Sequence, residues 1–110
     1  VRSIGWGAFQ WCSALREVRL PDGIAALEGS VFRGCSSLES VTIPAGVKLI
    51  GECAFFGCTE LRSATVLADE ISFGMAVFEG CPELTVRGCA GGAAEAYAAK
   101  YGIPFAAIEP

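Results

Sequence analysis

The 110-residue chain contains no histidine. Without it, no Ser-His-Asp or Cys-His catalytic arrangement can form within the chain, and a common zinc ligand is missing. No apolar run approaches the ~18 residues that a membrane-spanning helix needs, although 53% of the residues are hydrophobic. We therefore expect a noncatalytic chain that holds no cofactor or metal and does not insert into a membrane.

Basic residues are also few. The chain has 8 Lys and Arg against 12 Asp and Glu, which gives a formal net charge of −4. The basic residues form no cluster interleaved with aromatics, whereas binding to phosphate backbones depends on clustered Lys and Arg. Nucleic acids and anionic membrane surfaces are therefore disfavoured as partners.

What the chain does have is a repeat of 23 residues. We call a set of positions one period apart a column. Five columns are Phe9, Phe32, Phe55 and Phe78; Cys12, Cys35, Cys58 and Cys81; Leu15, Leu38, Leu61 and Leu84; Ile4, Leu27, Ile50 and Phe73; and Leu20, Ile43 and Val66. Periods of this length mark solenoids, in which stacked copies bury a continuous core that no copy can form alone.

Each copy predicts the same series of elements. Residues 18–20, 41–43 and 64–66 alternate apolar and polar, as in a strand with one buried face. Pro21 and Pro44 end the first two strands because proline cannot donate a ladder hydrogen bond. A turn, a second short extended stretch and one helical or 3₁₀ turn then complete the coil. A further column holds only small residues, which predicts close backbone packing there: Gly7, Ser30, Cys53 and Ala76.

The pattern IGxxAFxxCxxLxxVxIP resembles the BspA-like (Treponema-type) leucine-rich repeats of bacterial and some protist surface proteins. It covers residues 4–21, 27–44 and 50–66, and the tail resembles that family's usual ending. The resemblance implies a curved solenoid with a parallel sheet on its concave side. It also implies adhesion or protein interaction, often at cell surfaces, and no catalysis. The third copy departs from the pattern at Leu67, Asp69 and Glu70, so we expect an irregular loop before Ser72.

The ends of the chain differ from each other. Val1 falls within a repeat, so we expect a piece of a longer protein, with repeats at about 1–20, 21–43, 44–66 and 67–86 in a single domain. Residues 87–110 are expected to form a C-terminal cap, with an alanine-rich helix over 93–101. Gly102 is placed as the residue that ends the helix, with Pro104 beyond it.

Six cysteines raise the question of disulfides or metal binding. Four of them recur once per coil and should point the same way, whereas a disulfide needs facing Cβ vectors. We interpret them as small buried hydrophobes. Cys89 is placed in a core strand column without a gap or near the cap with one, and is expected to be buried in both cases. Free thiols favour a reducing setting weakly.

Binding surfaces are the remaining functional candidates. The outward positions of the predicted sheet are Glu17, Arg19, Ser40, Thr42, Ser63 and Thr65. Three aromatics are predicted to be exposed, and exposed apolar residues can mark an interface: Trp6, Trp11 and Phe56. The two tryptophans could instead pack against upstream repeats. Arg16, Glu39 and Arg62 share a column and should stack with alternating sign, which a structural role explains.

The hypothesis for function is a noncatalytic interaction or adhesion segment of a larger, bacterial surface or secreted protein, with a protein or glycan ligand. Its localisation would be extracellular. A spacer arm and an intracellular, cytoplasmic scaffold remain as alternatives.

Overall fold

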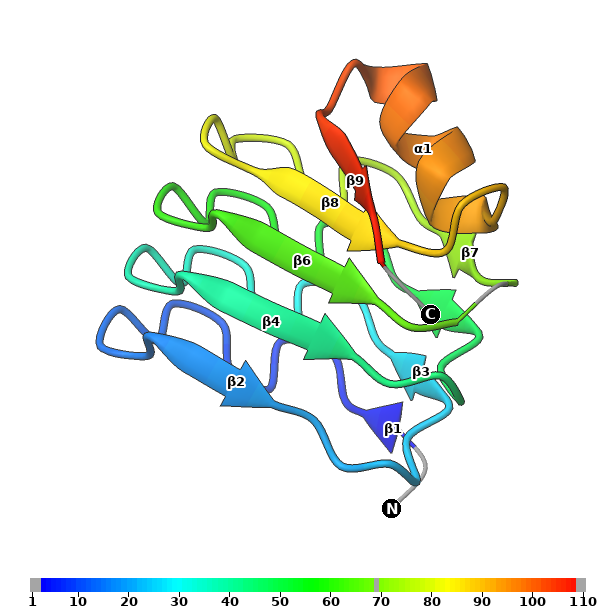
Figure 1. The fold of residues 1–110 in the computed structure, drawn as a ribbon. Coiled ribbons are helices and arrows are strands. Elements are labelled where there is room, and N and C mark those ends of the chain that lie inside the picture. Colours follow the sequence, from blue (N-terminus) through cyan, green and yellow to red (C-terminus); the bar gives the residue numbers. More distant parts are fainter. Residues whose placement is uncertain (1–2, 69, 109–110) are drawn as a thin grey trace.

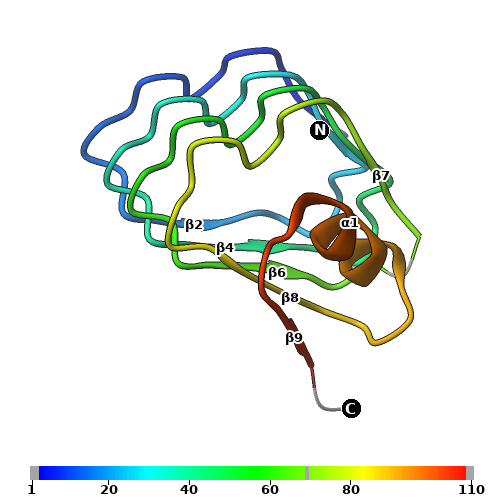
Figure 2. The ribbon, with the colours of Figure 1, turned by 90° about the horizontal axis from the view of Figure 1, so that it is seen from above.

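The computed structural model describes residues 3–68 and 70–108. The chain winds through successive coils that stack along one axis, and helix α1 (Ala93–Tyr101) closes the C-terminal end of the stack (Figure 1). Viewed along the stack, a large sheet runs along one side of each coil, and turn segments form the opposite side (Figure 2). The leucine-rich-type solenoid predicted from the repeat is confirmed.

The large sheet supplies one long side of every coil. It comprises β2 (Glu17–Arg19), β4 (Ser40–Ile43), β6 (Ser63–Val66), β8 (Thr85–Gly88) and β9 (Phe105–Ala107). All neighbours pair in parallel, in the order β2-β4-β6-β8-β9. The first three strands pair at the 23-residue period, which confirms the strands expected from the alternating pattern. The cap adds β9 to the same sheet.

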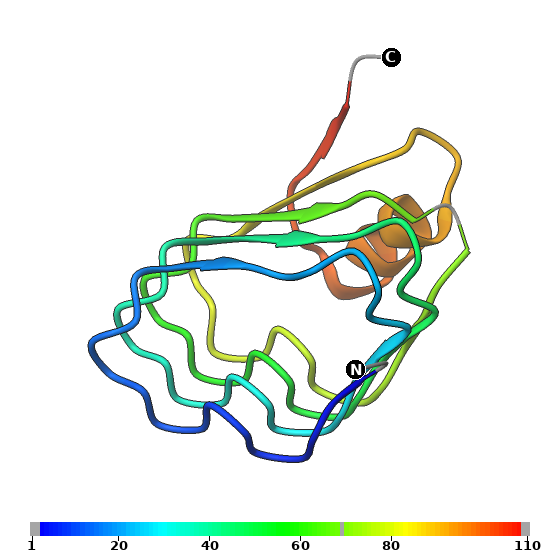
Figure 3. The same cartoon turned by 90° about the horizontal axis from the view of Figure 1, so that it is seen from below.

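A smaller sheet forms a second side of the coils. It contains β1 (Ser3–Ile4), β3 (Ala26–Leu27), β5 (Leu49–Ile50) and β7 (Ser72–Phe73), again paired in parallel and in this order. Figure 3 shows how each coil passes from this sheet into the turn segment and on to the large sheet. These strands are the short extended stretches predicted after each turn.

The turn segments form hydrogen-bonded turns and not the regular helical or 3₁₀ turn expected there. They contain i→i+3 backbone hydrogen bonds, such as those donated by Arg33 to Ser30 and by Cys35 to Phe32. Two columns interrupt any helix because they lie in the left-handed region, where non-glycine residues are strained. The columns are Gly7, Ser30, Cys53 and Ala76 with φ 55–64°, and Trp11, Gly34, Gly57 and Gly80 with φ 64–82°. The small-residue column therefore reflects a backbone conformation as well as packing.

Stacked phenylalanines form the centre of the core. The Phe9, Phe32, Phe55 and Phe78 rings lie 5.3–5.4 Å apart between centroids, with interplanar angles of 7–14°. Phe32 and Phe55 are fully buried. The amides of Phe9, Phe32 and Phe55 donate to carbonyls of the following coil, as from Phe9 to Val31 and from Phe32 to Ala54. Ring stacking and backbone bonding thus hold the same register along the stack.

The cysteine column packs beside the phenylalanine stack. The thiols of Cys35, Cys58 and Cys81 donate to the carbonyl oxygens of Phe9, Phe32 and Phe55 at 3.1–3.2 Å. No disulfide links cysteines within the described residues, and of the recurring four Cys35 and Cys58 are buried as expected, whereas Cys12 and Cys81 are only half-buried. Burial raises the pKa of Cys58 to about 12 and that of Cys81 to about 11, so these thiols resist forming the reactive thiolate.

The C-terminal cap covers one end of the core. Tyr97 of α1 stacks on Phe73 at 4.2 Å and meets Phe78 edge to face at 6.1 Å. Gly102 ends the helix with φ 68°, and its amide donates back into the last turn, as the sequence predicted. Phe78 at this end is 5% exposed, whereas Phe9 at the other end is 42% exposed. The cap therefore covers the last coil's core residues in the way that a following coil covers those of the earlier coils.

The last repeat is one residue shorter than the others. Thr85 pairs with Ser63 and Gly88 with Val66, an offset of 22 residues. Cys89 consequently follows the strand opposite Leu67, whose carbonyl accepts from its thiol at 3.9 Å. Cys89 is half-buried, so the expectation of a fully buried residue was wrong. The irregular loop expected before Ser72 includes Asp69, which lies outside the described residues.

Candidate recognition face

The outer face of the large sheet carries two rows of polar side chains. Strand pairing places one row across β2, β4, β6 and β8 as Glu17, Ser40, Ser63 and Thr85. A second row two residues further on consists of Arg19, Thr42, Thr65 and Arg87. Glu17, Thr42 and Arg87 are exposed, and the Ser residues, Thr65 and Thr85 are half-buried. The Arg19 side chain lies outside what the structure describes.

The alternation of the strands explains why these rows face outward. Successive side chains of a strand point to opposite faces. Val41, Ala64 and Val86 lie between the two rows and are buried in the core. A one-residue slip would expose these apolar side chains, so the core fixes the outer rows rigidly. The outward rows predicted from sequence are placed on one surface by this register.

A charged column borders the two rows. The amide of Glu39 donates to the carbonyl of Arg16, and the amide of Arg62 donates to the carbonyl of Glu39. All three residues are exposed. They therefore occupy successive positions along the sheet with alternating charge, as the sequence predicted. The shorter last repeat has no counterpart of Arg62, so the column ends there.

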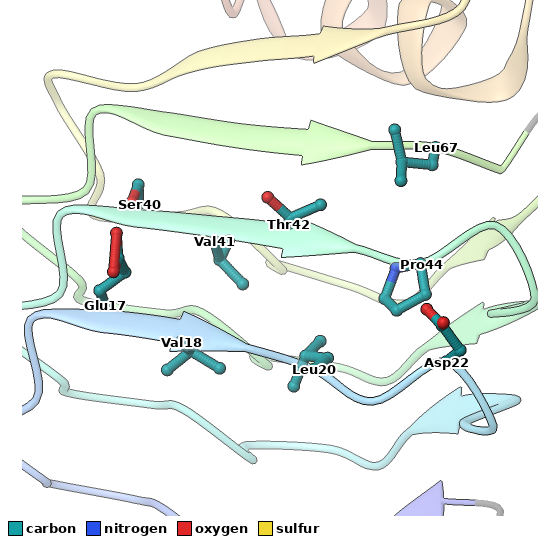
Figure 4. Close-up of a pocket in the computed structure, with 9 residues that line it drawn as sticks. All are labelled: Glu17, Val18, Leu20, Asp22, Ser40, Val41, Thr42, Pro44 and Leu67. Atoms are coloured by element: carbon teal, nitrogen blue, oxygen red, sulfur yellow. The ribbon is translucent and has the colours of Figure 1, made fainter.

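A shallow hollow of about 230 Å³ lies at the N-terminal part of this face (Figure 4). Carboxylates of Glu17 and Asp22 and hydroxyls of Ser40 and Thr42 line it. Pro44 and Leu67 add apolar surface, and Leu67 is 42% exposed. The lining supplies hydrogen-bond acceptors, donors and an apolar contact. Asp22, Pro44 and Leu67 lie outside the rows predicted from the sequence, although Pro21, Pro44 and Leu67 occupy one column beyond the strand end.

The three predicted aromatics lie elsewhere, on the turn segments. Trp6 and Trp11 are 64% and 61% exposed, and Phe56 is half-buried. A Cβ at Gly29 would overlap the Trp6 ring, and one at Gly34 would overlap the Trp11 ring. Each tryptophan therefore packs on a glycine of the following coil. Packing of the two rings against an upstream repeat stays an alternative, because both rings are largely exposed on their other sides.

A cation–π ladder links two of the aromatics. The Arg33 guanidinium lies 5.9 Å from the Trp11 ring centroid and 4.8 Å from that of Phe56. Such contacts stabilise by roughly 0.5–1 kcal/mol at exposed sites. The turn segments, which carry the aromatics, and the large sheet lie on different sides of the coil (Figure 2), so the structure does not bring the two predicted sets together into one site.

The described residues offer little to reactive chemistry. Within 3–68 and 70–108, no group of three His, Cys, Asp or Glu side chains is arranged to hold a metal ion. No helix in this part of the chain has the length and hydropathy to cross a bilayer. The geometry instead suits contact with another molecule over the sheet face.

Stacked 23-residue coils with parallel sheets define a leucine-rich-repeat solenoid. A family model described as the BspA type leucine rich repeat region (6 copies) matches residues 1–87. The chain belongs to this family, which confirms the resemblance found in its repeats. Leucine-rich repeats of this kind are generally protein-interaction or adhesion scaffolds without catalytic function.

A solved structure is similar over nearly the whole chain. It is the crystal structure of a leucine-rich repeat protein from Bacteroides ovatus, 33% identical, with a TM-score of 0.71. The match covers 98% of this chain but only 29% of that one. No curated protein matches the chain.

Proposed function

We propose that the chain is a noncatalytic interaction segment of a larger bacterial surface or secreted protein, and that it binds a protein or glycan ligand through the outer face of the large sheet. The observation that carries this proposal is the pair of polar rows held in register over a buried core. Because the strands are already ordered, binding would immobilise little backbone.

The chemistry of the face fits a polar ligand. Ser40, Ser63, Thr65 and Thr85 offer hydroxyl groups that both donate and accept hydrogen bonds. Arg87 adds a charged donor at one end, and Glu17 adds an acceptor at the other. The neighbouring hollow provides Leu67 as an apolar anchor beside the Asp22 carboxylate. A ligand that crosses several coils would meet these groups at the strand spacing of about 4.8 Å.

An intracellular scaffold is the second candidate. Cysteines that form no disulfide, such as Cys35 and Cys58, are more typical of a reducing compartment than of an oxidising one. Under this alternative the same face would bind a protein partner. A spacer arm differs from both because it would need no ligand.

The test is a binding screen with matched variants. The chain is immobilised and probed with extracellular matrix proteins, cell-surface proteins and a glycan array. The face variant carries Thr42→Arg and Thr65→Arg, and the control carries Gln10→Arg and Glu52→Gln on exposed turn positions, so that both change the net charge by the same amount. We expect at least tenfold weaker binding for the face variant and unchanged binding for the control.

The other outcomes decide between the alternatives. Equal loss in both variants would point to nonspecific charge effects and contradict the assignment of the face. Loss only in the control would move recognition to the turn side with Trp6, Trp11 and Phe56. Absence of any ligand would favour the spacer arm.

A further inference from the structure

A second hollow lies at the C-terminal end of the solenoid, away from the sheet face. It has a volume of about 420 Å³, within the range of small-molecule sites. The last turn segment and the cap helix α1 enclose it, and its walls include Met75, Phe78, Glu79, Tyr97, Tyr101 and Ile103. None of these residues lines the hollow on the sheet, so the two hollows are separate.

Three aromatic rings form a corner in this hollow. The Phe78 and Tyr97 rings meet at 69° with centroids 6.1 Å apart, and the Tyr97 and Tyr101 rings meet at 43° with centroids 4.7 Å apart. Phe78 is nearly buried, whereas Tyr101 is 52% exposed. Because the Phe78, Tyr97 and Tyr101 rings are tilted relative to one another, their faces and edges line the hollow and do not pack flat against each other to fill it.

The position of Tyr97 is fixed by the core. Its ring stacks on Phe73 with centroids 4.2 Å apart, and the residue is half-buried. The cap therefore holds this wall whether or not a ligand is present. Because the Tyr97 ring is already held in place, little conformational entropy would be lost when a ligand binds, and the affinity would be reduced little.

The charge around the corner favours a cation. Glu79 is exposed and is the charged residue among those lining the hollow. The ammonium nitrogen of Lys100 already lies 5.4 Å from the Tyr101 ring centroid, so this ring takes a cation within the chain itself. Lys100 is not among the residues that line the hollow, and a bound cation would compete with its ammonium group for the Tyr101 ring.

We propose that this hollow binds a small quaternary ammonium cation, with Phe78, Tyr97 and Tyr101 as an aromatic cage and Glu79 as the counter-charge. Aromatic faces attract cations through the ring quadrupole, and methylated ammonium groups suit such cages because they need no hydrogen-bond acceptors. Met75 and Ile103 would contact the methyl groups. The cation could be free in solution or part of a choline headgroup of a lipid.

The first experiment titrates the chain with choline chloride and with its neutral isostere 3,3-dimethylbutan-1-ol, followed by NMR chemical-shift changes. We expect choline to bind with a dissociation constant on the order of millimolar, as a ligand of few atoms allows. The isostere should bind at least tenfold more weakly because it lacks the charge. Equal affinities would overturn the proposal.

Variants then test the cage. Tyr101→Leu should weaken choline binding about tenfold, and Tyr101→Phe should retain it because the ring is kept. Glu79→Gln should weaken binding several-fold, and Glu60→Gln, at another exposed glutamate, should not change it. Circular dichroism verifies the fold of each variant. Unchanged affinity in both folded Tyr101→Leu and Glu79→Gln would refute the assignment.

A vesicle arm distinguishes the two sources of the cation. Co-sedimentation with phosphatidylcholine vesicles that free choline competes away would identify a lipid headgroup as the source. Choline binding without sedimentation would identify a free cation. These variants leave the sheet face intact, so failure here is distinguishable from failure of the proposed sheet-face function.

Discussion

The phenylalanine stack allows a quantitative test of how each coil depends on its neighbours. Phe55 is fully buried between Phe32 and Phe78, with ring centroids 5.3 and 5.4 Å away. Truncating a buried Phe to Ala removes transfer free energy and leaves a cavity, for a combined loss of about 3–5 kcal/mol. We expect Phe55→Ala to lower the free energy of unfolding by about 4 kcal/mol.

Phe9 is the matched control because it has the same role at an open end. It stacks on Phe32 alone and is 42% exposed. Its side chain loses less buried area on truncation, and water can fill part of the space, so Phe9→Ala should lower the free energy of unfolding by about 2 kcal/mol.

Urea unfolding of the 110-residue chain, followed by circular dichroism, measures both losses. At a urea dependence of about 2 kcal/mol/M, the midpoints should fall by about 2 M for Phe55→Ala and about 1 M for Phe9→Ala. If Phe55→Ala does not fold, Phe55→Leu should still lose more than Phe9→Leu. Equal losses at the two positions, or a greater loss at Phe9, would refute the continuous stack.

Three further predictions follow from the coil contacts. Gly51→Ala should lower the free energy of unfolding by about 2 kcal/mol or more, because a Cβ would lie 2.5 Å from a backbone nitrogen of the preceding coil. Gly5→Ala should change this free energy by under about 0.5 kcal/mol, because a Cβ there would have nothing within 4 Å. Thermal unfolding compares the two variants. The pKa values of Cys58 (about 12) and Cys81 (about 11) lie above the ordinary 9.0. The contribution of these protonated thiols to stability is therefore complete below pH 9 and should be lost as the pH rises from 9 towards 12. Urea midpoints that rise with pH between pH 8 and 11 would contradict this prediction. Arg33→Gln should lower the free energy of unfolding by about 0.5–1 kcal/mol, because it removes the cation–π contacts of Arg33. A double-mutant cycle with Phe56→Leu that gives no coupling energy would argue against these contacts.

The repeat columns predicted most of the fold because each buried position recurs at one period. Leu27, Phe32 and Leu61 are fully buried, as an apolar column in a stack requires. The cap helix was predicted at its observed bounds because its alanines, Gly102 and Pro104 are local signals. These features depend on short-range chemistry and on the period, and both can be seen in the sequence.

Other features depend on coil-to-coil contacts that the columns do not encode. Trp11 adopts a φ of 64° in a column otherwise filled by glycine, and its ring covers Gly34 of the next coil. Cys89 lies opposite Leu67 because the last repeat lacks one residue, and a gap of one could be placed only from the strand pairing. The separation of the aromatics from the sheet rows likewise required the geometry of the coil. The second hollow, at the C-terminal end, depends on how α1 packs against the last turn segment, and no repeat column predicts this packing.

NMR mapping of the ligand-binding surface tests whether the outer face of the large sheet binds the ligand. The chain is labelled with ¹⁵N, titrated with the ligand found in the binding screen, and each amide is followed through the titration. If the sheet face binds the ligand, the largest shifts should fall within β4 and β6, around Thr42 and Thr65, with little change in the turn segments. Shifts concentrated around Trp11 and Phe56, with β4 and β6 unaffected, would contradict it.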